Sequence, residues 1–338
     1  MTAFITRRGA RRGCPALTTE RVSAKFPAVP QIRELHITNF RCLRDVHLTF
    51  EPLTILVGPN AAGKTALLDA LELRPKVKPE NVWRREPGLT VQRSGRLDNG
   101  QEFRADLGPT VISPLLHDPW RSLRLQLVPA KLRAANQVAD ETDLARDGGN
   151  LTNVFASLSR TVQGELAARF CDLVPLYADL DVRPLHGGTH RLVFQDRWID
   201  TWYEPHQVSD GTMVLLAFLT LAHLRNAPDI LAIEEPEYAL HPYLVGEVVA
   251  LLRKLAHGEL GKPVQVILAT HSAELLNFAQ PTEVRFLSRS LEDGSTRVRT
   301  APLETDEWRA AFAEYEESMG ELWLSGSLGG VPGTTTAQ

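Results

Sequence analysis

Short apolar runs followed directly by Gly-rich or acidic segments are the main pattern along this chain. Residues 53–57 (Leu-Thr-Ile-Leu-Val) are apolar and partly β-branched, and residues 230–233 (Ile-Leu-Ala-Ile) are entirely apolar. Continuous apolar runs of this length are typical of strands buried on both faces of a sheet. From residue 230 onward strands and helical patterns alternate, so the sequence predicts an α/β fold with a parallel sheet.

Further segments outside this sheet have patterns that predict local structure. Turn residues at Pro87-Gly88 and at 98–100 separate short strand-like runs, and Gly187-Gly188 does the same later in the chain. The spacing at 151–174 is helical, without the heptads of a long coiled coil. The predicted elements are a β-hairpin over 33–50, antiparallel strands over 82–105, helices over 151–174, two or three strands over 181–203, and an apolar helix over 213–224.

Composition excludes several classes of protein. The chain has 338 residues, a net charge of −4 and three scattered cysteines, so neither a zinc site nor a disulfide framework is indicated. The longest apolar stretch, 213–224, is too short to span a bilayer, and we expect a cytoplasmic protein without membrane association. Residues 1–30 carry six basic side chains, one acid and three prolines, which predicts a disordered arm. Two readings of this arm stay open, a nucleic-acid contact and a segment upstream of the true start.

Residues 58–65 match the phosphate-binding pattern G-x-x-x-x-G-K-[ST] at every defined position. They lie between the strand at 53–57 and a run of helix formers at 66–73, which directs backbone N–H groups and a helix N-terminus at one place. Lys64 would neutralise phosphates and the Thr65 hydroxyl would bind Mg²⁺, so ATP and Mg²⁺ are the expected ligands. The candidate nucleotide ligands in this loop are Gly58, Pro59, Asn60, Ala61, Ala62, Gly63, Lys64 and Thr65.

A second candidate site follows the apolar run at 230–233, where Glu234 and Glu235 come in succession. Two carboxylates at the end of a buried strand are costly unless a cation or a polarised water meets them. Glu234 would hold Mg²⁺ and Glu235 would activate the attacking water. A solvent-facing acid pair is the alternative interpretation of these two residues alone.

Several motifs in one fixed order resemble the ABC-type ATPases of the RecF/SMC-like group. Among these the chain looks like the compact stand-alone ATPases of the AAA-15/AAA-21 type, which resemble an OLD-like ATPase domain without its Toprim module. The resemblance runs from about residue 35 to about residue 332. The motifs are Leu35 to Leu43, the loop at 58–65, Ser209-Asp210-Gly211, Glu234 to Glu237 with Leu240-His241-Pro242, and Thr270-His271-Ser272.

The resemblance implies roles for further residues. Ser209 and Gly211 would be the signature motif, which contacts the γ-phosphate held by a second copy of the chain in a head-to-tail homodimer. His271 would be the catalytic switch histidine, and Arg41 would reach the nucleotide. Glu234 stands where most such proteins have Asp, and Ala61-Ala62 replace a common Gly-containing pair, which together suggest slow hydrolysis. The glutamine that completes the Mg²⁺ shell is not identified, with Gln92 and Gln126 as candidates.

The expected fold is therefore a P-loop, ABC-type ATPase head with a mixed central sheet, an antiparallel β-lobe and a helical signature lobe. The expected function is ATP hydrolysis that closes a homodimer, coupled to DNA repair or to phage and plasmid defence. Double-stranded DNA and a separate nuclease or effector are the expected partners. An ATP-gated interaction switch and an ABC transporter ATPase subunit are the alternatives. The expected divisions are an arm at 1–30, one ATPase domain at 31–325 (core at 31–75 and 226–325, lobes at 76–225) and a flexible tail at 326–338.

Overall fold

The structure is a computed structural model that describes residues 30–72, 77–108, 120–315 and 318–326. Apart from residues 30 and 326, the segments that the sequence assigns to a basic arm and a flexible tail lie outside the described residues.

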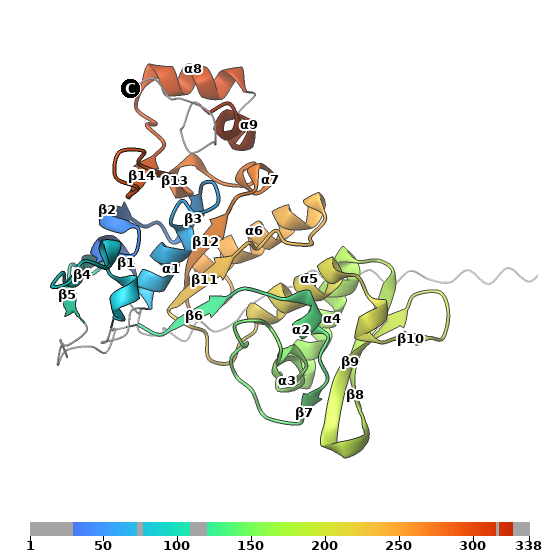
Figure 1. Cartoon of the computed structure of the whole chain (residues 1–338). Helices are drawn as coiled ribbons and strands as arrows, with labels where there is room; N and C mark the ends of the chain where they lie inside the picture. The colour runs from blue at the N-terminus through green and yellow to red at the C-terminus, as the bar shows by residue number, and fades with distance from the viewer. Residues whose placement is uncertain (1–29, 73–76, 109–119, 316–317, 327–338) are drawn as a thin grey trace, which may run out of the picture.

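A six-stranded mixed sheet forms the centre of the molecule (Figure 1). The strands lie in the order β14-β13-β3-β12-β11-β6, with β14 antiparallel to β13 and the other neighbours parallel. The predicted mixed sheet is thus confirmed, including its strands at 53–57 and 230–233. The bounds are β3 (Leu53–Val57), β6 (Ser122–Leu125), β11 (Ile230–Glu234), β12 (Gln265–Thr270), β13 (Val284–Arg289) and β14 (Thr296–Thr300).

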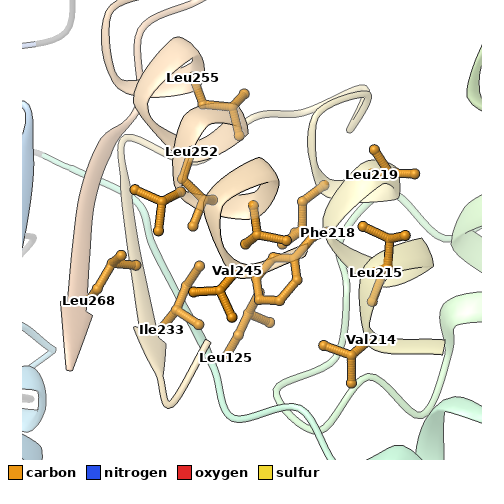
Figure 2. Close-up of a cluster of buried hydrophobic side chains, with 14 of the residues drawn as sticks. Leu125, Val214, Leu215, Phe218, Leu219, Ile233, Val245, Leu252, Leu255 and Leu268 are labelled. Atoms are coloured by element: carbon orange, nitrogen blue, oxygen red, sulfur yellow. The ribbon is translucent and has the colours of Figure 1, made fainter. Parts of the chain in front are cut away.

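The central strands are buried on both faces because alternate side chains enter two different cores. In β11, Leu231 and Ile233 belong to one core, whereas Ile230 and Ala232 belong to the other. Helices α5 (Asp210–Leu221) and α6 (Pro242–Ala256) supply the first core, where their side chains meet those of β6, β11 and β12 (Figure 2). Helix α1 (Lys64–Leu71) and an antiparallel sheet supply the second.

That antiparallel sheet is the expected β-lobe, and its strands lie in the order β2-β1-β4-β5. The predicted hairpin is confirmed, since β1 and β2 pair in register from Glu34 with Thr49 to Phe40 with Leu43. The same β1 strand also pairs with β4, so the hairpin is part of the lobe. The bounds are β1 (Ile32–Phe40), β2 (Leu43–Thr49), β4 (Val91–Leu97) and β5 (Glu102–Leu107).

The helical lobe lies on the other side of the central sheet (Figure 1). The long β8–β9 hairpin projects from it, and α5 joins it to the first core. The bounds in the lobe are α2 (Pro129–Leu132), β7 (Asn136–Gln137), α3 (Leu151–Ala156), α4 (Arg160–Leu173), β8 (Tyr177–Pro184), β9 (Thr189–Asp196) and β10 (Trp202–Tyr203). The remaining helices, near the C-terminal end of the described residues, are α7 (Ala273–Leu276), α8 (Asp306–Glu314) and α9 (Met319–Leu324).

Across the described parts of the chain, the helices are too short or too polar to cross a bilayer.

Candidate nucleotide-binding site

The loop at 58–65 connects β3 to α1, as its motif predicts. Gly63 is the N-cap residue of α1 and has φ 110°. Because glycine has no side chain, Gly63 cannot cap the first N–H groups of the helix. A Cβ atom on Gly63 would lie 2.3 Å from the Thr296 hydroxyl oxygen, which in turn donates to the Ala62 carbonyl at 2.9 Å. Glycine is therefore required here by both backbone angle and space.

Lys64 points back over the loop. Its ammonium donates to the carbonyls of Gly58 at 2.6 Å and Pro59 at 3.0 Å. Burial lowers the pKa of Lys64, and the nearby carboxylates of Glu235, Glu237 and Glu234 oppose that shift. A cation held by loop carbonyls at the start of a helix can exchange these contacts for phosphate oxygens.

Thr65 on α1 and Glu234 at the end of β11 are in contact. The Thr65 hydroxyl donates to Glu234 Oε2 at 2.9 Å, although the residues are 169 positions apart. Glu234 ends β11, two strands from β3 in the sheet, so the parallel order brings both to the same edge. Thr65 and Glu234, which were each predicted as Mg²⁺ ligands, are thus in direct contact.

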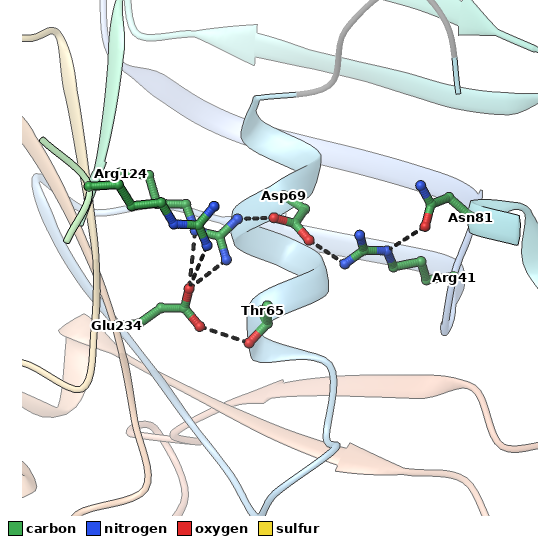
Figure 3. Close-up of polar contacts among 7 residues, drawn as sticks. Arg41, Thr65, Asp69, Asn81, Arg124 and Glu234 are labelled. Carbon is green, nitrogen blue, oxygen red and sulfur yellow. Dashed lines mark hydrogen bonds and ion pairs between the residues drawn. The ribbon is translucent and has the colours of Figure 1, made fainter. Parts of the chain in front are cut away.

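A buried arginine holds the same glutamate from the other side (Figure 3). The Arg124 side chain is only 3% exposed, and its Nε and Nη2 donate to Glu234 Oε1 at 3.2 and 2.5 Å. Arg124 also pairs with Asp69 on α1, and Arg146 lies 3.4 Å from Glu234 Oε1. Asp69, Arg124 and Arg146 were not predicted from the sequence as parts of the site. The one available signal was a charged residue inside the apolar run Leu123-Arg124-Leu125.

Arg41 is part of this network. Its guanidinium pairs with Asp69 and donates to Asn81 Oδ1 at 3.0 Å (Figure 3). Arg41 also lines the cavity at the loop, so it lies beside the site where the resemblance placed it. In this structure Arg41 donates to Asp69 on α1 and to Asn81. Arg41 therefore links α1 to the β1–β2 hairpin of the β-lobe.

Glu235 and His271 lie together at the ends of β11 and β12. The Glu235 carboxylate is 3.4 Å from His271 Nδ1, and each side chain is about half exposed. Glu235 has φ 49°, a left-handed angle that is rare for a residue with a side chain, and its N–H donates to the Ala269 carbonyl at 2.8 Å. Such backbone angles persist where surrounding contacts impose them, and they are frequent at functional sites.

Glu237 is a third acid at this edge, and it is mostly buried. Thr270 donates to its Oε1 at 2.6 Å, whereas Oε2 has no hydrogen-bond partner among the described residues. Burial raises the pKa of Glu237, and the bond from Thr270 counteracts that shift. Glu237 thus links the loop after β11 to the end of β12, next to His271.

Ser209 and Gly211 begin α5 and are not among the residues that line the cavity at the phosphate loop. Ser209 caps the helix, accepting from the Thr212 N–H at 3.2 Å. A Cβ atom on Gly211 would lie 2.4 Å from the Ala239 carbonyl oxygen, so glycine lets the helix contact the loop after Glu237. Asp210 pairs with Arg133, which supplies the compensation that a carboxylate near phosphate would need.

The two glutamine candidates occupy different sheets. Gln92 lies on β4 in the antiparallel sheet, opposite Thr38 and Asp106. Gln126 directly follows β6, where Leu125 pairs with Ile233, so it comes beside Glu234 in register. The register therefore brings Gln126, and not Gln92, to the edge that carries the acids.

These elements enclose a cavity of about 290 Å³. It offers helix N–H groups, one ammonium, one hydroxyl and two carboxylates, which together suit a polyanion with a hard cation. The lining residues are Arg41, Cys42, residues 60–66, Glu234, Glu235 and Ala269.

Comparison with known proteins agrees with this geometry. A family model described as "AAA domain, putative AbiEii toxin, Type IV TA system" matches residues 53–277, which include the phosphate loop, the acids of β11 and His271. That range is more than half of the chain.

Curated relatives match over short segments. An OLD nuclease of Thermus scotoductus is 52% identical over 42 residues, 12% of this chain and 8% of that protein. A DNA replication and repair protein RecF of a Synechococcus strain is 58% identical over 43 residues, 12% of this chain and 11% of that protein. The chain thus matches about a tenth of the length of these relatives.

Solved structures match over most of the chain. One SMC head, bound to the C-terminal winged-helix domain of ScpA, has a TM-score of 0.55 at 16% identity, covering 81% of this chain and 98% of that one. The SMC head of Pyrococcus furiosus has a TM-score of 0.52 at 13% identity, covering 85% and 99%. At such identities the likeness concerns the fold. The family match shows that the chain belongs to this AAA-domain family, and with the phosphate loop and the SMC-head fold the chain is a P-loop ATPase that resembles the RecF/SMC-like ABC group.

Proposed function

We propose that the chain binds ATP with Mg²⁺ and hydrolyses ATP, and that ATP closes two copies head to tail. The observation that carries the proposal is the contact between Thr65 and Glu234, 2.9 Å apart, with Glu235 next along the chain. It brings a hydroxyl, a carboxylate and a candidate base to the end of the phosphate loop.

The residues at this point fit Mg²⁺. Thr65 and Glu234 offer oxygen donors, the ligand type that Mg²⁺ prefers, and Gln126 follows β6 at the position beside Glu234 in register. When bound, Mg²⁺ would neutralise charge on the β- and γ-phosphates. Lys64 and the N-terminus of α1 would bind the same phosphates, after Lys64 releases the carbonyls of Gly58 and Pro59.

Glu235 is the proposed general base. It would take a proton from a water molecule whose oxygen attacks the γ-phosphorus, while the bond from that phosphorus to the bridging oxygen of ADP breaks. His271 lies 3.4 Å from Glu235 and would donate to the γ-phosphate. Ser209 and Gly211 would act on the nucleotide of the second copy, since both lie outside the cavity of their own chain.

What the cycle drives is inferred from the relatives. A RecF protein named for DNA replication and repair, and an OLD nuclease, share short segments with this chain. We therefore propose coupling to DNA repair or to defence against foreign DNA, with a separate nuclease or effector as partner. An ATP-gated interaction switch uses the same residues and differs from this proposal in its hydrolysis rate.

The test is steady-state ATP hydrolysis by wild type and Glu235→Gln, each with and without double-stranded DNA at low salt. Removing a general base lowers kcat by about 10² to 10⁴-fold, and we expect that loss here while ATP binding is retained. Equal rates in wild type and variant would remove Glu235 from this role.

The DNA arm of the experiment separates the two functions. Stimulation of the wild-type rate by DNA would support DNA-coupled activity. Slow turnover that is indifferent to DNA would support the switch and direct the search to a protein partner.

A further inference from the structure

Two histidines and an aspartate gather on the outer face of the β1–β2 hairpin, on the β-lobe. In β1, Leu35 and Ile37 enter the core, so His36 between them faces outward. In β2, Val46 and Leu48 are buried, so Asp45 and His47 face outward. The alternation of the two strands thus directs three side chains with metal-ligand chemistry to one face.

The register brings these side chains together. His36 and His47 are directly opposite in the ladder, and their rings stack with centroids 3.7 Å apart and planes at 15°. His36 Nε2 lies 2.7 Å from Asp45 Oδ1, and His47 Nε2 lies 3.8 Å from the same oxygen. Ligand atoms from all three residues lie within 4.8 Å of one another.

These distances suit a shared cation. Ligands held about 2.0–2.2 Å from a tetrahedral ion are themselves about 3.3–3.6 Å apart. The two nitrogen–oxygen distances at Asp45 lie on either side of that value, and an ion is admitted once the two stacked rings, whose planes lie at 15°, turn apart so that both nitrogens point at it. The side chains are 34%, 67% and 73% exposed for His36, Asp45 and His47, which leaves them free to rotate.

We propose that His36, Asp45 and His47 form a binding site for a divalent transition-metal ion, with Zn²⁺ as its representative. Imidazole ligands select Zn²⁺, Ni²⁺ and Cu²⁺ over Mg²⁺, so the site differs in chemistry from the one at Thr65 and Glu234. His36 and His47 also line a surface cavity of about 1160 Å³. An ion would reach the two histidines through this cavity, and its remaining coordination positions would face the cavity. The ion fastens β1 to β2 on the face opposite the core.

The experiment is a calorimetric titration of the untagged, metal-free full chain with Zn²⁺ alone, without nucleotide. The variants are His47→Asn and His36→Asn, and the control is His206→Asn. His206 lies 3.3 Å from Glu204 and is 70% exposed, a comparable histidine–carboxylate pair without the second histidine.

We expect wild type and His206→Asn to bind one Zn²⁺ at this site, with an affinity at least tenfold lower in each hairpin variant. Zn²⁺ should also raise the thermal midpoint of wild type by more than that of His47→Asn. Because His47 is exposed, this variant keeps the fold, which its metal-free thermal midpoint verifies. Binding unchanged in His47→Asn, or an absence of Zn²⁺ binding by folded wild type, would overturn the proposal.

Discussion

At the scale of single residues, Arg124 is the side chain that connects the two halves of the nucleotide site. It is buried between Glu234 of β11 and Asp69 of α1, and it uses separate nitrogens for each. A guanidinium can bridge two carboxylates in a fixed plane, whereas an ammonium is a single point charge. Arg124 is therefore a positioning residue that fixes the rotamer of Glu234 opposite Thr65.

Arg124→Lys tests that role. It keeps the charge but cannot satisfy both carboxylates, so Glu234 loses its orientation. Loss of an outer-shell partner lowers metal affinity about 10 to 100-fold, and we expect the Mg²⁺ concentration for half-maximal ATPase activity to rise about tenfold. Binding of a fluorescent ATP analogue in EDTA should change less than about twofold, because Lys64 and the helix N-terminus are untouched.

The control for this experiment is Arg146→Lys. Arg146 is 54% exposed and reaches Glu234 at 3.4 Å, so its contribution should be small. An unchanged Mg²⁺ requirement in a folded Arg124→Lys protein would show that Glu234 is positioned by other contacts.

The candidate nucleotide ligands could be selected from the sequence because their spacing is local. Residues 58–65 form one motif, and Glu234 with Glu235 directly follows an apolar strand. Arg124 was not predictable in this way, since its partners lie 55 and 110 positions away. Sequence spacing shows which residues share a loop, but the pairing of β6 with β11 decides which residues share an edge.

At the scale of elements, Ser209 at the start of α5 has one observed role and one proposed role. Ser209 caps the helix, and in the proposed dimer it also faces the nucleotide of the second copy. Ser159 caps α4 in the same way, accepting from the Val162 N–H at 3.3 Å, and has no proposed ligand. The two residues form a matched pair for separating stability from function.

Ser209→Ala and Ser159→Ala should each cost about 1 kcal/mol of unfolding free energy, the usual value of an N-cap. Denaturant unfolding measures that loss. ATP hydrolysis at saturating ATP should fall clearly in Ser209→Ala and remain near wild type in Ser159→Ala. Equal ATPase rates in both variants would leave Ser209 as a cap alone.

The elements themselves followed from apolar pattern where the runs were long. The strands at 53–57 and 230–233 were predicted because no charged residue interrupts these apolar runs. The hairpin at 33–50 was also predicted, although β1 is buried on one face only. Strand β6 was not predicted, since its four residues include Arg124. The charged residue that interrupts the apolar pattern of this strand, Arg124, is the one that contacts Asp69 and Glu234.

At the scale of the whole molecule, the cavity at the phosphate loop and the start of α5 are separate features of the chain. The lining of the cavity comes from β1–β2, the phosphate loop, β11 and β12, while the start of α5 lies outside it. One copy of the chain thus carries the phosphate loop at this cavity. The capped N-terminus of α5, which suits an anion, lies elsewhere on the same copy. Head-to-tail pairing of two copies would bring each helix to the other copy's cavity.

That arrangement predicts that ATP controls the oligomeric state. Glu235→Gln should retain ATP and sediment as a dimer with ATP and Mg²⁺, because the charge that repels the γ-phosphate is gone and hydrolysis no longer opens the pair. Lys64→Ala should remain a monomer under the same conditions, since it lacks the cation that holds the phosphates. Sedimentation velocity on both variants, with and without ATP, distinguishes these states. A monomeric Glu235→Gln protein that demonstrably binds ATP would rule out closure of the dimer by nucleotide. Ser209 and Gly211 would then need a role within their own chain, where Gly211 already allows the close approach of the Ala239 carbonyl.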